Sequence, residues 1–73
     1  MTLYSRPGCH LCDEARARLA ELGIEPDEVN IEDDERLHSA FLERIPVVEV
    51  GGRIVSELGL DEVAVRAAIT SQS

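Results

Sequence analysis

The chain has 73 residues, a length that fits one domain with a thin core, expected over residues 1–73. Fifteen acidic residues against seven basic ones give a net charge of −8, which argues against a nucleic-acid binder and against docking on an anionic membrane. Apolar residues make up 44% of the chain, a normal globular composition, and no apolar run approaches the ~20 residues of a membrane span. Met1 leads directly into a β-prone segment without a basic region, so we expect no signal peptide. We also expect a cytoplasmic protein that acts as a monomer.

The first half of the chain predicts a strand, a helix and a second strand. Residues 2–5 are β-prone and end at a turn signal, Ser-Arg-Pro-Gly. Residues 9–22 are expected to form a helix, because one face at helical spacing is apolar. That face consists of Cys12, Ala15, Leu19 and Leu22. Gly23 suits the end of this helix, and a strand is expected around residues 28–31.

A second, shorter helix is predicted between the second strand and Pro46. Asp33 or Asp34 can cap its N-terminus, since a carboxylate there accepts hydrogen bonds from backbone N–H groups that have no partner in the helix. Its apolar face is expected to consist of Leu37, Ala40 and Phe41. Pro46 stops this helix, because proline lacks the N–H that a helix interior needs.

The remainder of the chain predicts a hairpin and a final helix. Gly51-Gly52 is a two-residue hairpin signal between two apolar runs. Asp61 can cap the final helix, where Leu60 and Val65 are spaced to pack against each other. The two strands, the helix and a frayed polar tail are expected at 47–50, 53–55, 61–69 and 70–73.

The predicted element order is β-α-β-α-β-β-α. A strand–helix–strand start implies two parallel strands joined by a right-handed crossover. The hairpin then adds antiparallel strands to the same sheet. The sequence therefore predicts an α/β fold with a four-stranded mixed sheet flanked by three helices.

Both cysteines of the chain lie in one short segment, Cys9-His10-Leu11-Cys12. This spacing places their Cα atoms about 5 Å apart on a helix, within reach of a disulfide. The Cys9 thiol lies at the helix N-terminus, which favours the thiolate and lowers its pKa below the free value of ~8.5. Cys12 lies one turn further on, on the buried face. We therefore predict that Cys9 attacks a disulfide and Cys12 resolves the intermediate.

Two basic side chains lie close to this pair in the sequence, one before Cys9 and one between the two cysteines. His10 follows Cys9 directly, and it either stabilises the Cys9 thiolate or is an ordinary exposed residue. Arg6 lies in the preceding turn, and it either contacts a substrate or is solvated like most loop arginines. The sequence alone leaves both alternatives open.

A metal site is a competing interpretation of the two cysteines. Zinc usually takes four ligands, and the chain has two Cys and two His residues. Cys9, His10 and Cys12 do not converge easily on one ion, because His10 turns about 100° away from Cys9 on a helix. We expect no metal in a single chain. A site shared by two chains, as in an iron–sulfur carrier, and an adapter without redox activity remain alternatives.

The chain resembles glutaredoxins of the thioredoxin-fold superfamily over nearly its whole length. The resemblance is strongest to short bacterial glutaredoxin-like proteins with a Gly-Cys-His-Leu-Cys-Asp motif. The matching segments are Leu3 to Cys12, Ile45-Pro46-Val47-Val48 and Gly59-Leu60-Asp61-Glu62. The resemblance implies a thioredoxin-like fold and thiol–disulfide exchange with protein or small-molecule disulfides.

The resemblance also assigns roles around the cysteines. In this family the proline matching Pro46 is cis and packs against the active-site disulfide. The residue before it, here Ile45, offers its backbone to the substrate or to glutathione. The electron donor is expected to be a low-molecular-weight thiol such as glutathione or a thioredoxin reductase-type flavoenzyme, and no bound cofactor is implied.

Two positions depart from glutathione-using glutaredoxins. Arg44 replaces the usual Thr of a Thr-Val-Pro segment, and Leu58 replaces the first Gly of a Gly-Gly segment. The missing glycine removes a place where bare backbone could approach the ligand closely. We therefore expect glutathione alone to support this protein weakly.

Overall fold

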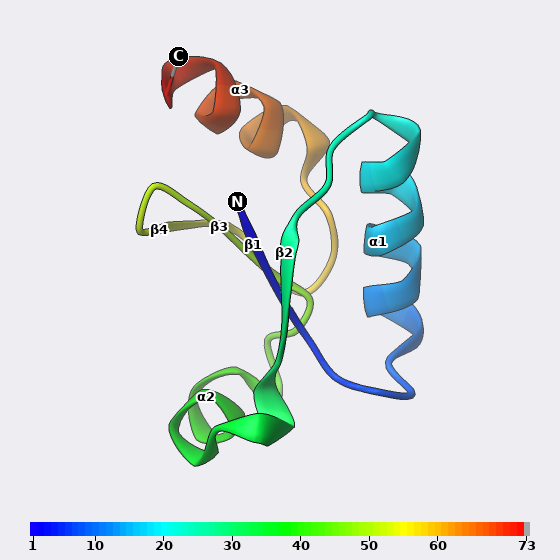
Figure 1. Ribbon diagram of the computed structural model, residues 1–73, viewed down its shortest axis with the longest axis vertical. Coiled ribbons are helices and arrows are strands. Elements are labelled where there is room, and N and C mark those ends of the chain that lie inside the picture. The colour runs from blue at the N-terminus through cyan, green and yellow to red at the C-terminus, as the bar shows by residue number, and fades with distance from the viewer. Residues whose placement is uncertain (73) are drawn as a thin grey trace.

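A four-stranded mixed sheet lies at the centre of the molecule, in strand order β2-β1-β3-β4 (Figure 1). The structure is a computed structural model, and it describes residues 1–72. The elements are β1 (Thr2–Ser5), α1 (His10–Glu21), β2 (Asp27–Asn30), the 3₁₀ turn η1 (Ile31–Asp33), α2 (Glu35–Phe41), β3 (Val47–Val50), β4 (Arg53–Ser56) and α3 (Glu62–Gln72). The predicted element order is confirmed, with η1 as an addition.

The strand pairing follows the predicted topology. β1 pairs with β2 in parallel and with β3 antiparallel, and β3 pairs with β4 antiparallel. The second strand ends one residue earlier than expected, at Asn30, because the chain turns into η1 at Ile31. The Asn30 side chain accepts a hydrogen bond from the Glu32 N–H at 2.9 Å and so caps this turn.

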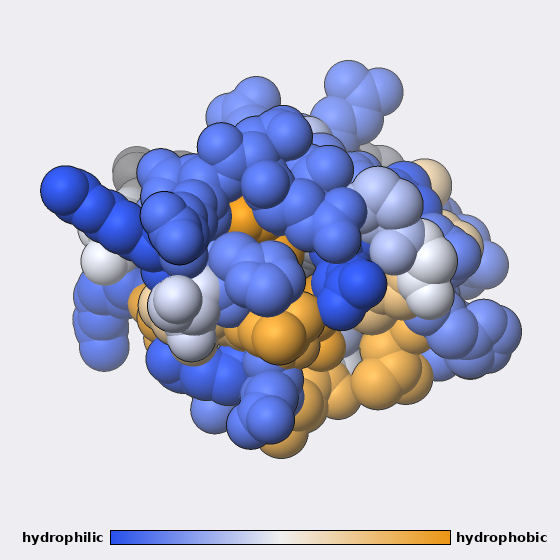
Figure 2. Space-filling model, turned by 90° about the horizontal axis from the view of Figure 1, so that it is seen from below, coloured by the Kyte–Doolittle hydropathy of each residue, from blue (hydrophilic) through white to orange (hydrophobic). Residues whose placement is uncertain are grey.

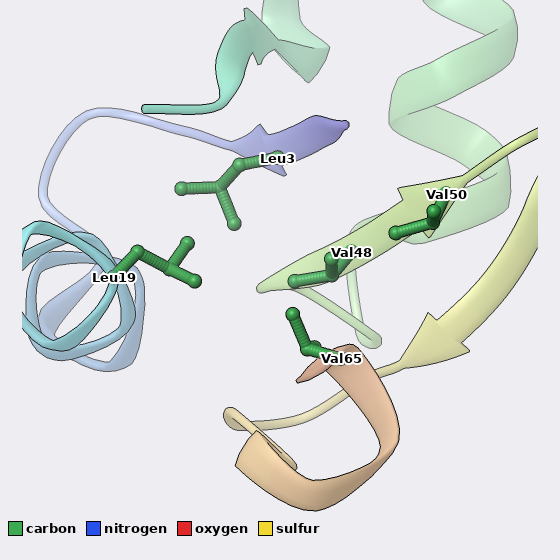
Figure 3. Close-up of a cluster of buried hydrophobic side chains, with 5 residues drawn as sticks. All are labelled: Leu3, Leu19, Val48, Val50 and Val65. Carbon is green, nitrogen blue, oxygen red and sulfur yellow. The ribbon is translucent and has the colours of Figure 1, made fainter. Parts of the chain in front are cut away.

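α1 and α3 pack on one face of the sheet. Figure 3 shows Leu19 of α1 and Val65 of α3 pointing toward the side chains of β1 and β3. The buried cluster between them consists of Leu3, Leu19, Val48, Val50 and Val65. The predicted apolar face of α1 is confirmed at Cys12, Ala15 and Leu19, which are buried, whereas Leu22 is the C-cap residue and only half-buried. The cluster fixes the position of α1, and thereby of the cysteines at its start.

α2 packs on the opposite face of the sheet. Side chains alternate along a strand, so Tyr4 points away from the cluster that contains Leu3. The Tyr4 ring lies 4.9 Å from the ring of Phe41 in α2, centroid to centroid. Leu37 also packs here, but Ala40 is exposed, so the prediction that Ala40 faces the core is wrong. α2 has only seven residues, and none of them is fully buried.

The predicted helix caps are confirmed, and the predicted tail is partly wrong. Asp34 accepts hydrogen bonds at the start of α2, and Asp61 accepts one from the Ala64 N–H at 3.1 Å. The segment expected to fray instead continues α3 to Gln72. The Ser71 hydroxyl donates to the carbonyl oxygen of Ala67 at 2.9 Å, so this polar side chain is satisfied within the helix. Ser73 lies outside the described residues.

None of the helices within residues 1–72 has the length and apolar character needed to cross a lipid bilayer.

Candidate functional site

Cys9 and Cys12 form a disulfide at the N-terminus of α1. β1 delivers the chain to a turn in which Gly8 has φ +78°, a left-handed conformation that glycine adopts without a steric penalty. Cys9 is the N-cap of α1, and Cys12 lies in its first turn. Their Cα atoms are 5.2 Å apart, which confirms the spacing expected from the sequence.

The two sulfur atoms have different environments. Cys12 has no exposed surface and packs with Ile31, Ile45 and Val47, whereas Cys9 is partly exposed. The Cys9 Sγ atom accepts a hydrogen bond from the Cys12 backbone N–H at 3.1 Å. A thiolate at this position would accept the same bond with full charge and lie at the positive end of the helix dipole. The geometry is therefore suited to a reactive Cys9 and a protected Cys12.

The peptide bond between Ile45 and Pro46 is cis, as the resemblance implies. Pro46 is fully buried, and Ile45 is 8% exposed and belongs to the same apolar cluster as Cys12. The Ile45 N–H donates to the carbonyl oxygen of Phe41 at 3.0 Å, which fixes this segment against the end of α2. The structure thus brings the Ile45-Pro46 segment and the cysteine pair to one end of the molecule.

The two predicted cationic modifiers both face carboxylates. Arg6 Nη2 lies 3.6 Å from Oε2 of Glu32, and His10 Nε2 lies 3.3 Å from Oε1 of Glu14. The His10 side chain is 86% exposed, which weakens any influence on the sulfur because water screens the interaction. The roles of Arg6 and His10 toward a substrate or a thiolate stay predictions.

Apolar side chains gather at this end of the molecule. Figure 2 views the end that carries α2 and the start of α1, and it shows an apolar area that runs from the middle to the lower right edge, with mostly hydrophilic residues above it. Leu11, between the two cysteines, is one of the large exposed apolar side chains, which also include Leu42 and Leu58. This end of the molecule is therefore less polar than the net charge of the chain suggests.

Arg44 links the end of α2, the cis-proline segment and the loop after β4. Its Nε atom donates to Oε2 of Glu57 at 2.7 Å, and its guanidinium carbon lies 5.4 Å from the centroid of the Phe41 ring. Its carbonyl oxygen accepts a hydrogen bond from the Leu58 N–H at 2.8 Å. No local pattern in the sequence relates Arg44 to Glu57, which lies 13 residues further along the chain.

The residues described here offer no preformed metal centre. Among residues 1–72, no three His, Cys, Asp or Glu side chains are grouped so that they could hold an ion. The two cysteine sulfurs are bonded to each other.

Comparisons with known proteins identify the family. A family model described as a glutaredoxin-like domain matches residues 1–70. The chain belongs to this glutaredoxin-like family. The search of curated proteins found no match. A solved structure, the Northeast Structural Genomics target protein XcR50 from X. campestris, is 38% identical and has a TM-score of 0.77. The alignment covers 96% of this chain and 95% of that chain.

The glutaredoxin-like assignment agrees with the geometry. Three helices around a four-stranded mixed sheet, together with this structural similarity, form a thioredoxin-like α/β fold. The close Cys9–Cys12 pair at the start of the first helix places a thiol-redox centre on that fold.

Proposed function

We propose that this protein is a thiol–disulfide oxidoreductase that uses Cys9 as the nucleophile and Cys12 as the resolving cysteine. The observation that carries the proposal is the asymmetry of the pair: the Cys9 sulfur is partly exposed at the start of α1, and the Cys12 sulfur is buried one turn away. The N-terminal backbone N–H groups and the helix dipole favour the Cys9 thiolate.

The proposed reaction has two exchange steps. The Cys9 thiolate attacks one sulfur of a substrate disulfide, the substrate S–S bond breaks, and the released substrate thiolate takes up a proton. Cys12 then loses its proton and attacks the Cys9 sulfur, which forms the Cys9–Cys12 disulfide and releases the second substrate thiol. Two electrons pass from the protein to the substrate. An external thiol or a flavoenzyme must return two electrons before the next cycle.

The surroundings of the pair favour a polypeptide disulfide as substrate. We propose that Ile45 offers its carbonyl oxygen to an extended chain, because its N–H already donates to the carbonyl oxygen of Phe41. Arg6 is the proposed charged contact with the substrate. The apolar surface at this end of the molecule, to which the exposed Leu11 beside Cys12 contributes, can cover the apolar side chains that flank a substrate cysteine. We propose that the protein acts in the cytoplasm as a monomer, where a low-molecular-weight thiol or a thioredoxin reductase-type flavoenzyme regenerates it.

A single-turnover experiment tests the proposed activity without assuming a donor. Fully reduced protein is mixed with a peptide that carries one disulfide, and free thiols on the peptide are counted after acid quenching. The wild type is expected to release two peptide thiols per protein and to end as the Cys9–Cys12 disulfide. The Cys9→Ser variant is expected to release none. Equal release by wild type and Cys9→Ser would contradict the proposal.

The competing functions give different outcomes in the same preparation. A coloured protein with bound iron or zinc would favour metal carriage by a pair of chains. A colourless protein with an intact dithiol that does not exchange with the peptide would favour an adapter. Metal content and absorbance are measured before the exchange experiment.

A further inference from the structure

A hydrogen-bonded charge cluster lies behind the turn that carries Cys9. The guanidinium of Arg16 donates to both carboxylate oxygens of Glu28, from Nε at 2.7 Å and from Nη2 at 2.6 Å. Its Nη1 atom donates to Oδ1 of Asp13 at 2.7 Å. The hydroxyl of Ser5, which is buried, donates to Oε2 of Glu28 at 2.9 Å. Four side chains from β1, α1 and β2 thus form one network.

The network is connected to both cysteines through short stretches of chain. Ser5 ends β1, four residues before Cys9, and Asp13 follows Cys12 directly. The Asp13 N–H also donates to the carbonyl oxygen of Cys9 at 3.1 Å. Arg16 lies one helical turn beyond Cys12, so its Cα atom is roughly 10 Å from that of Cys9 along the helix axis, about one Debye length at 0.1 M salt.

We propose that Arg16 and Glu28 are positioning residues that hold the Cys9 turn against α1 and set how readily Cys9 ionises. This inference rests on the proposed dithiol chemistry for its biological meaning, but its physical content concerns only the thiol. The cluster holds one positive charge between two carboxylates. Its balance therefore contributes to the electrostatic potential at the start of α1, together with the helix dipole.

The sign of each effect follows from this balance. Removing the Arg16 charge leaves Asp13 and Glu28 without their cation, and the cluster, now more negative by one unit, disfavours the Cys9 thiolate. Removing the Glu28 charge leaves Arg16 less compensated, which favours the thiolate. Hydrogen bonds from Arg16, and to a lesser extent from Ser5, lower the pKa of Glu28, so the carboxylate stays charged at neutral pH.

Other ion pairs at this end of the molecule are left unchanged by the test. Arg6 pairs with Glu32 across from the turn, and His10 pairs with Glu14 on α1. Arg44 pairs with Glu57 beside the cis-proline segment. Within residues 1–72, none of these three pairs shares a hydrogen bond or ion pair with the cluster, so the substitutions do not remove a partner from any of them.

The experiment measures the pKa of the Cys9 thiol by thiolate absorbance in a Cys12→Ser background, where only one thiol titrates. The test variants are Arg16→Gln, Glu28→Gln and the combination of the two. Arg18→Gln is the matched control, because Arg18 makes the same kind of two-carboxylate contact near the far end of α1. Arg16→Lys keeps the charge and tests rescue.

We expect Arg16→Gln to raise the pKa of Cys9 and Glu28→Gln to lower it, each by at least about 0.3 of a unit at low salt. The double variant should lie between the two, and Arg16→Lys and Arg18→Gln should match the parent protein. Shifts of Arg16→Gln and Glu28→Gln in the same direction, or shifts no larger than that of Arg18→Gln, would overturn the inference. If the pKa shifts are observed but the protein does not reduce the peptide, the result contradicts the proposed activity and leaves this inference about the Cys9 thiol standing.

Discussion

The Leu58 backbone N–H donates a 2.8 Å hydrogen bond to the carbonyl oxygen of Arg44. This bond joins the loop before α3 to the segment that enters the cis Ile45-Pro46 bond. Leu58 has φ +62°, and its side chain stays 59% exposed. A leucine in the left-handed region costs about 1–2 kcal/mol relative to glycine. This loop therefore keeps a backbone conformation that is unfavourable for leucine at an exposed position.

Replacement of Leu58 by glycine is expected to raise the rate with glutathione. Glycine fits φ +62° and exposes bare backbone, so a bound tripeptide could approach the loop closely. Stability should stay equal or rise by up to about 1 kcal/mol, because relief of backbone strain is partly offset by the entropy of glycine in the unfolded chain. The measurement is turnover of a small mixed disulfide with glutathione and glutathione reductase as the sole reductants.

Leu58→Ala is the matched control for that comparison, because it shortens the side chain and keeps the Cβ atom. A rate between those of wild type and Leu58→Gly is expected for it. If wild type already turns over as fast as Leu58→Gly, the steric argument against glutathione is wrong.

The two thiols of the reduced protein are expected to titrate apart. The Cys9 pKa should lie below the free-cysteine value of ~8.5, since the helix N-terminus stabilises its thiolate. The Cys12 pKa should lie above that value, because the buried site disfavours charge. Thiolate absorbance against pH in Cys12→Ser and Cys9→Ser separates the two. A Cys9 that titrates like free cysteine would remove the main physical support for its role.

The Glu28 ion pair gives stability a defined pH dependence. Arg16 holds the pKa of Glu28 in the folded protein below its ordinary value of 4.5. The stabilisation is therefore fully present above that ordinary value and is lost as the pH falls through the folded pKa. The measurement is the difference in unfolding free energy between wild type and Glu28→Gln. We expect it to shrink as the solution is acidified below pH 4.5. A difference that stays constant with pH would contradict this account.

Local sequence patterns predicted most of the fold. The apolar spacing of Cys12, Ala15 and Leu19 identified the buried face of α1 before its partners were known. The capping residues Asp34 and Asp61 fixed the starts of α2 and α3, because a cap acts within one turn of its own helix. The cysteine pair could also be identified from local sequence, because Cys9 caps α1 and Cys12 lies in its first turn.

The features that the sequence did not predict depend on the length of α2 or on contacts between segments that are distant in the sequence. Ala40 has the correct spacing for a buried residue, but the seven-residue α2 buries none of its residues fully and leaves Ala40 exposed. The 23-residue separation between Ser5 and Glu28 hides their hydrogen bond from any local pattern. The pairing of Arg44 with Glu57 is hidden in the same way, since each residue alone resembles an ordinary surface charge.

The central claim is that Cys9 attacks and Cys12 resolves. Its most direct test is to mix Cys12→Ser, and separately Cys9→Ser, with a disulfide-bonded peptide and to map the product by mass spectrometry after proteolysis. The account predicts a stable mixed disulfide on Cys9 in the first variant and little or none on the buried Cys12 in the second. A mixed disulfide that forms on Cys12 as fast as on Cys9 would contradict the account.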